Sequence, residues 1–208
     1  GHRRRQHLHL GELLGGVEDR RQVTQTRHLG EVLLGAGHHP EGDVMRHTAQ
    51  VMTATALICN AKGIDGDARQ IRQAAALVHD IGKISHTVVE TDGSITSAGH
   101  AEADDERAVA LLDAIGFPKR LQPQAIALKR NHMKPHFALG RPAINRLADE
   151  LGEAGVTIDD LVDLAIADKS GRSVSGQIII RECPEAEALR IKAGELALLR
   201  GRPAPVLQ

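Results

Sequence analysis

Residues 74–83, Ala-Ala-Ala-Leu-Val-His-Asp-Ile-Gly-Lys, combine an apolar helical run with a His-Asp pair at its end. The helix is expected to break at Gly82, just beyond His79 and Asp80. Because adjacent helical positions lie about 100° apart, these two side chains can converge on one point only near a helix end. An imidazole and a carboxylate together suit a divalent metal of the Mn, Fe, Co, Ni or Zn type. A single His-Asp pair is weak evidence, because an Asp can also simply orient a buried His.

Composition predicts one soluble domain built mainly from helices. The 208 residues are 41% apolar, with two Phe and no Tyr or Trp, so the core must consist of Leu, Ile, Val and Ala. No apolar run approaches the ~20 residues of a membrane helix. The formal charge of −1 and the shortage of aromatic rings argue against bulk binding of duplex DNA and against base stacking as a main binding mode.

The cysteine content and the start of the chain favour a cytoplasmic protein. Cys59 and Cys183 are far apart and outside any CxxC spacing, so two reduced thiols are expected, although one disulfide stays open. No apolar signal segment follows Arg3-Arg4-Arg5. The chain opens on Gly-His rather than Met, so its first residues could come from a longer parent.

Periodicity separates an irregular start from a helical remainder. Residues 1–37 form an N-terminal segment of uncertain structure, and residues 38–208 form the predicted domain. One helix is expected from Val44, and others at about 68–80, 101–115, 121–132, 142–151, 158–171 and 185–199. Thr87–Thr91 and Ser94–Ser97 flank Asp92-Gly93, which predicts a single small β-hairpin near residues 87–97. The expected fold class is therefore all-α, with one hairpin.

Polar residues on the apolar faces of these helices point to a shared site. His47, His132 and Asp168 each fall on a stripe that should face inward, and a fourth helix supplies His79 and Asp80. A single histidine of this kind is more often a core residue that bonds a neighbouring backbone. Burying an Asp, however, is costly unless a cation or a hydrogen-bond donor is present. Four helices that each aim such a group inward are most simply explained by a metal.

The ordered motifs resemble the HD-domain phosphohydrolase superfamily, and more narrowly the HD domain of bacterial CCA-adding tRNA enzymes. The resemblance covers roughly residues 38–205, so the predicted domain is an HD-domain helical bundle. It is carried by His39-Pro40-Glu41-Gly42-Asp43-Val44 with His47-Thr48, by Ala76–Lys83, and by Gly99-His100, Asn131-His132 and Asp168–Arg172. The sequence contains no nucleotidyltransferase region, so the resemblance does not extend to nucleotide addition.

The resemblance implies a metal-dependent phosphohydrolase. It implies that His47, His79, Asp80 and Asp168 hold a divalent ion, with Mn, Ni, Co, Fe, Mg or Zn as candidates. In dinuclear relatives, residues at the positions of His100 and His132 bind a second ion, whereas comparable histidines of mononuclear relatives face the substrate phosphate. Both arrangements stay open, with two ions slightly favoured.

Catalysis is assigned to Asp80 and Lys83, the latter close enough to the His-Asp pair to reach a phosphate. Lys83, Arg130 and Arg172 are the expected substrate-binding residues, although cations near helix ends are also favoured by the helix dipole or simply solvated. A bound metal lowers the pKa of water and neutralises charge on phosphoryl oxygens. The expected substrates are small nucleotides or RNA-end phosphate esters, including 2′,3′-cyclic phosphodiesters.

Two other functions remain open from the sequence. One is a non-catalytic helical module that binds tRNA or a partner domain. The other, hydrolysis of guanosine alarmones by another HD branch, fits the His-Asp pair but not the opening motif. A complete set of candidate metal ligands that face inward favours catalysis over the binding module. The sequence leaves the oligomeric state undetermined.

Overall fold

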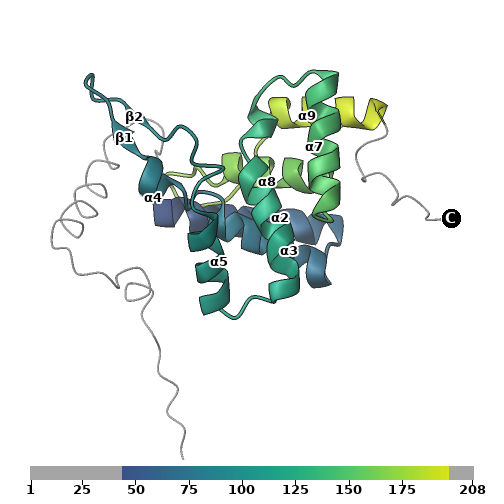
Figure 1. Cartoon of the computed structure of the whole chain (residues 1–208), viewed down its shortest axis with the longest axis horizontal. Helices are drawn as coiled ribbons and strands as arrows, with labels where there is room; N and C mark the ends of the chain where they lie inside the picture. The colour runs from purple at the N-terminus through teal and green to yellow at the C-terminus, as the bar shows by residue number, and fades with distance from the viewer. Residues whose placement is uncertain (1–43, 197–208) are drawn as a thin grey trace, which may run out of the picture.

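The computed structural model describes residues 44–196, and these residues fold into packed helices with one small hairpin (Figure 1). This arrangement confirms the all-α prediction. The elements in chain order are α2 (Val44–Lys62), α3 (Gly66–Val78), α4 (Lys83–His86), β1 (Val88–Val89), β2 (Ile95–Thr96), α5 (Asp105–Ala114), the 3₁₀ turn η1 (Lys119–Leu121), α6 (Gln122–Asn131), the 3₁₀ turn η2 (Lys134–His136), α7 (Arg141–Glu153), α8 (Ile158–Ser170) and α9 (Pro184–Glu195).

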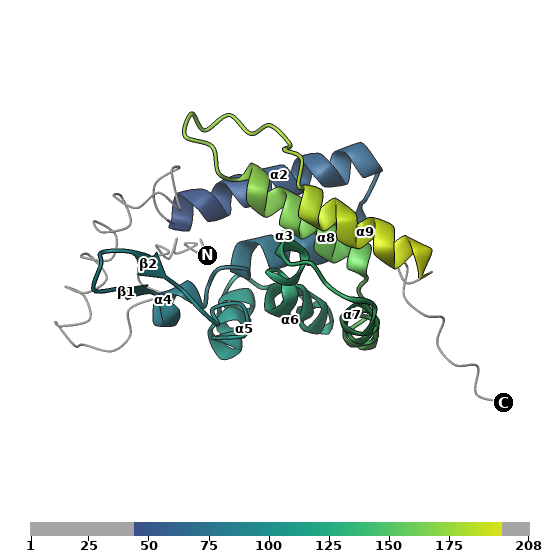
Figure 2. The same ribbon diagram turned by 90° about the horizontal axis from the view of Figure 1, so that it is seen from above.

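Helix α8 lies at the centre of the packing. It contacts α2, α3, α6, α7 and α9, and Figure 2 shows it running between α2 and α9. Its side chains are buried on almost all sides, apart from a few polar positions such as Asp159 and Lys169. The helix begins with a capping box in which Thr157 and Asp160 exchange side-chain-to-backbone hydrogen bonds. A helix buried in this way presents its last turn, with Asp168, to the interior.

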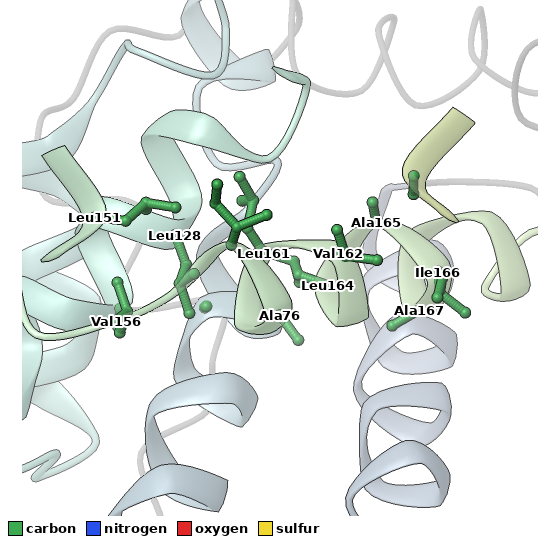
Figure 3. Packing of buried hydrophobic residues seen from close by; sticks show 14 of the residues in the cluster. Ala76, Leu128, Leu151, Val156, Leu161, Val162, Leu164, Ala165, Ile166 and Ala167 are labelled. Atoms are coloured by element: carbon green, nitrogen blue, oxygen red, sulfur yellow. The ribbon is translucent and has the colours of Figure 1, made fainter. Parts of the chain in front are cut away.

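Aliphatic side chains and alanines fill the core, as the lack of aromatic residues requires. Leu128, Leu151 and Leu161 are completely buried and lie close together in the core (Figure 3). Helix α3 contributes a run of buried small residues, Ala74–Ala76. Small side chains let helices approach closely, and α3 packs against α2, α6 and α8. The end of α3 is thereby brought next to three other helices.

The hairpin forms at the predicted place, with shorter strands than expected. Val88 pairs with Thr96 and Val89 with Ile95 in an antiparallel ladder. The Gly93 N–H donates to the Glu90 carbonyl, and Gly93 has a φ of 83°. Asp92-Gly93 is therefore part of a three-residue loop, residues 91–93, closed by a left-handed glycine.

Two predicted helix boundaries were wrong by a few residues near the His-Asp pair. The helix predicted to reach Asp80 ends at Val78, and the helix predicted from Ala101 begins at Asp105. The intervening residues form turns that pack against each other. The helix predicted to reach Leu199 ends at Glu195, where Leu196 forms a turn, and residues 197–208 lie outside the described part of the chain.

Cys59 and Cys183 are buried and unpaired, as expected for reduced thiols, and burial raises the pKa of both. Among residues 44–196, none of the helices has the length and apolar character needed to cross a membrane. The N-terminal segment and the motif from His39 to Asp43 lie outside the described residues.

Candidate metal centre

Six predicted ligand residues meet in one buried cluster. His47 comes from the first turns of α2, and Asp168 from the last turn of α8. His79 and His132 are the residues that end α3 and α6, and Asp80 follows His79 in a turn. His100 lies in the turn between the hairpin and α5. None of the six is more than 7% exposed.

The first group of donor atoms surrounds His47. Its Nε2 lies 2.9 Å from Asp168 Oδ1 and 3.4 Å from His79 Nε2. Asp80 Oδ2 lies 3.2 Å from His79 Nε2 and 3.6 Å from His47 Nε2. The separations among His47, His79 and Asp80 fit inside one coordination sphere, because ligands about 2.0–2.2 Å from an ion stand roughly 3–4 Å apart. Asp168 lies beside this group, against His47.

The second group of donor atoms surrounds the other carboxylate oxygen of Asp80. Asp80 Oδ1 lies 3.2 Å from His100 Nε2 and 3.7 Å from His132 Nε2, and the two imidazole nitrogens are 3.2 Å apart. Asp80 thus faces His47 and His79 with one oxygen, and His100 and His132 with the other. This geometry suits one carboxylate between two ions.

Backbone carbonyl groups set the orientation of all four rings. The Nδ1 atoms of His79, His100 and His132 lie 2.7–2.8 Å from the carbonyl oxygens of Ala76, Ser97 and Lys129. His47 Nδ1 lies 3.3 Å from the Gly171 carbonyl oxygen. In the neutral ring each Nδ1 therefore carries the proton, and each Nε2 can direct a lone pair into the cluster.

This donor set fits a divalent cation. The Nε2 atoms of His100 and His132 face each other across 3.2 Å, and those of His47 and His79 across 3.4 Å. In neutral rings these nitrogens are hydrogen-bond acceptors, and so are the nearby carboxylates of Asp80 and Asp168, so the cluster has more acceptors than donors. A cation among the donor atoms of a group would satisfy the acceptors of that group. Imidazole nitrogen with carboxylate oxygen suits Mn, Fe, Co, Ni and Zn.

The carboxyl groups are held ionised in this environment. Burial alone would raise the pKa of Asp80, but His79, His100 and Lys83 outweigh it and hold the pKa well below its usual value. Asp168 behaves in the same way, through His136, His47, His79 and Arg172. Anionic carboxylates are the form that binds metal.

Two glycines allow the helices and turns that carry the cluster to pack closely against each other. A Cβ on Gly82 would lie 2.0 Å from the His100 carbonyl oxygen, so only glycine lets the turn with His100 pack against the end of α3. A Cβ on Gly171 would lie 2.5 Å from Val51 Cγ2, where the end of α8 meets α2. Close contact between elements therefore explains Gly82 in the motif Ala76–Lys83 and Gly171 in the motif Asp168–Arg172.

Lys129 anchors the turn that carries His100. Its side chain is completely buried, and Nζ donates to the Ala103 carbonyl and, over 2.9 Å, to Asp105 Oδ1. From the sequence alone, a solvated charge is the favoured interpretation of Lys129, with binding of a phosphate or an RNA backbone as the alternative. Its role in the described structure is to fix residues 100–105 against α6.

Lys83 and Arg172 lie at the pocket that opens onto the cluster. The cavity has a volume of about 270 Å³ and is lined by Asp80, Lys83, Thr87, Ile95, Ser97, His100, His132, Met133, Asp168 and Arg172. Lys83 Nζ lies 2.7 Å from Asp80 Oδ2, and Arg172 Nη2 lies 3.4 Å from Asp168 Oδ2. Both cations thus stand beside the carboxylates of the cluster, at the pocket.

The structure places Arg130 elsewhere. Its guanidinium pairs with Asp105, and the side chain lines a different pocket with Lys119 and Glu150. The sequence could not separate it from the pocket cations, because helical spacing does not show which neighbour it meets. We do not retain Arg130 as a substrate-binding residue.

Sequence reasoning missed one histidine at the site. His136 Nε2 lies 3.5 Å from Asp168 Oδ2. Its four-residue spacing from His132 was a possible signal, but Pro135 argued against a continuous helix.

Comparison with known proteins agrees with this arrangement. Residues 44–172 match the family model for the HD domain. A stretch of 102 residues, 49% of this chain, is 30% identical to the "Multifunctional CCA protein" of Halorhodospira halophila. The match spans 22% of the length of that relative. No solved structure matched.

Proposed function

This chain belongs to the HD domain family, and we propose that it is a metal-dependent phosphohydrolase acting on nucleotide or RNA-end phosphate esters. The reactions proposed are those of a phosphomonoesterase or a 2′,3′-cyclic phosphodiesterase. The observation that carries the proposal is the pair of donor groups joined by Asp80, namely His47, His79 and Asp80 on one side and Asp80, His100 and His132 on the other.

A divalent ion at these residues would polarise the phosphoryl group and provide an activated water at neutral pH. In this assignment His47, His79, Asp80 and Asp168 hold one ion, while His100 and His132 either hold a second or face the phosphate. Asp80 belongs to both groups, so it is the residue on which either arrangement depends.

The protein's own cations would bind the substrate. Lys83 and Arg172 line the pocket and carry N–H donors that can move from the carboxylates to phosphoryl oxygens. Arg172 is adjacent to Ser173, whose backbone N–H and carbonyl both bond the side-chain amide of Gln50 on α2. This reciprocal pair holds the residue next to Arg172 at the edge of the pocket.

The pocket favours a small or terminal phosphate ester. A volume of about 270 Å³ admits a phosphate with an attached sugar, whereas a duplex would need a long cationic surface. The net charge of −1 does not provide such a surface. The CCA protein relative is consistent with a substrate at an RNA end, although tRNA nucleotide addition is not proposed for this chain.

The experiment is a substrate panel with chelator-treated protein. It contains 2′-, 3′- and 5′-nucleotides, 2′,3′-cyclic nucleotides and p-nitrophenyl phosphates, each with Mn²⁺, Ni²⁺, Co²⁺ or Mg²⁺. Metal-dependent turnover of at least one nucleotide substrate is expected. Arg172→Gln should raise KM, whereas Arg130→Gln, the control cation outside the pocket, should leave it unchanged. Absence of turnover together with metal-independent tRNA binding would favour the binding-module alternative.

A further inference from the structure

We propose that His136 is a positioning residue that fixes the Asp168 carboxylate for metal binding, an inference that rests on the proposed metal centre. His136 ends η2, four residues after His132. Its Nε2 is buried and has no hydrogen-bond partner among the described residues, yet it lies 3.5 Å from Asp168 Oδ2. A buried ring nitrogen normally has a partner, and the outer oxygen of Asp168 is the acceptor within reach.

The two oxygens of Asp168 face different partners. Oδ1 lies 2.9 Å from His47 Nε2, next to the first donor group, while Oδ2 faces His136 at 3.5 Å and Arg172 Nη2 at 3.4 Å. Donors at Oδ2 keep the carboxylate from rotating, so Oδ1 stays directed at the ion site. A shift of about half an ångström turns the contact with His136 into a standard hydrogen bond.

His136 is better suited than Arg172 to a permanent holding role. The Arg172 side chain is 40% exposed at the pocket, whereas that of His136 is 22% exposed. The backbone of His136 is fixed by Pro135, which is buried, and by a hydrogen bond from the His136 N–H to the Met133 carbonyl. Arg172 can therefore leave Asp168 to bind a phosphate while His136 keeps the carboxylate in place.

One short segment would thus serve both donor groups. His132 contributes its Nε2 to the group on Asp80 Oδ1, and His136 holds the ligand of the other group. Partners that hydrogen-bond metal ligands typically change metal affinity 10–100-fold when removed. His136 should therefore control the affinity of the ion at His47, His79 and Asp168 without contacting it.

The test is calorimetric titration of Mn²⁺ into the chelator-treated full chain. His136→Phe keeps a ring but removes the donor, and it should weaken the binding of one ion about 10–100-fold. His136→Gln restores an N–H donor and should stay within about threefold of wild type, because an amide can donate to a carboxylate as the imidazole does. Urea unfolding of the metal-free forms should give equal stabilities for the two variants.

The possible results separate this inference from the proposed function. Tight binding by wild type with unchanged affinity in His136→Phe would overturn the inference alone. Equal weakening in both variants, with matching losses of metal-free stability, would also overturn it, because the role would then be structural. Wild-type protein that binds no ion would overturn the inference and the proposed function together.

Discussion

The Nε2 atoms of His100 and His132 lie 3.2 Å apart, and in the neutral rings neither nitrogen has a hydrogen to donate across that gap. Each ring already directs its Nδ1 proton to a backbone carbonyl, that of Ser97 or that of Lys129. Two facing lone pairs repel unless a cation or a proton lies between them. Because the pKa of His132 is lowered to about 3, a proton on that ring is disfavoured near neutral pH, so a metal is the better partner.

Metal removal should therefore destabilise the protein. An ion that binds only the folded state adds about 2.7 kcal/mol to the free energy of unfolding when its concentration is 100 times its Kd. Urea unfolding with Mn²⁺ should show an increase of this size over the same protein in EDTA. Superimposable unfolding curves would contradict a metal bound by the folded state.

The metal-free protein should lose stability as the pH falls below about 6.5, in part through His132. Burial and the positive charge of His79 lower its folded pKa to about 3, so below about 6.5 only the unfolded state takes up the proton. Unfolding then becomes easier by up to about 1.4 kcal/mol per pH unit from this residue.

His79 affects the pH dependence of stability in the opposite direction. Burial alone would lower its pKa, but Asp80 and Asp168 outweigh this and raise it. Its stabilising proton is fully present below about 6.5 and is lost as the pH rises through the folded pKa. Measuring the free energy of unfolding of wild type and of His132→Gln in EDTA from pH 7.5 to 4.5 isolates the contribution of His132. The free energy of unfolding should change less with pH in the variant. Parallel curves would exclude the assigned role of His132.

Asp80→Asn should abolish hydrolysis and leave the fold unchanged. The amide keeps the shape of the carboxylate but not its charge, and both donor groups lose their shared ligand. Because a bound metal contributes several kcal/mol to transition-state stabilisation, turnover should fall at least about 1000-fold. Steady-state rates and far-ultraviolet circular dichroism are the measurements, and near-normal activity would place the chemistry elsewhere.

Gly82→Ala should be strongly destabilising. The added Cβ would lie 2.0 Å from the His100 carbonyl oxygen, a backbone atom that cannot move without displacing His100. We expect a loss of about 3 kcal/mol or more in the free energy of unfolding, in the range typical of severe core clashes.

Gly152→Ala is the matched control for this clash. No atom lies within 4 Å of the Cβ position at Gly152, which is inside α7, so alanine should be neutral or stabilise by up to about 1 kcal/mol. Chemical unfolding compares the two variants directly. Equal stabilities would show that the turn with His100 does not depend on close contact at Gly82.

Much of the fold followed from local pattern, because long helices with a continuous apolar face are determined by nearby residues. The site depended on packing between elements. His47 and Asp168 were found because they interrupt apolar stripes, whereas His136 lies on a short 3₁₀ turn that has no stripe to interrupt. Lys129 looked like a surface charge, and only the structure shows that Ala103 and Asp105 surround its ammonium group. Tertiary contacts of this kind leave no periodic signal in the sequence.

Metal analysis of protein purified without chelator tests the central claim most directly. Wild-type protein should retain one or two equivalents of a divalent transition metal by inductively coupled plasma mass spectrometry. Asp80→Asn, purified in parallel, should retain much less. Wild-type protein without bound metal, even after incubation with Mn²⁺, Ni²⁺, Co²⁺ and Zn²⁺, would contradict the account.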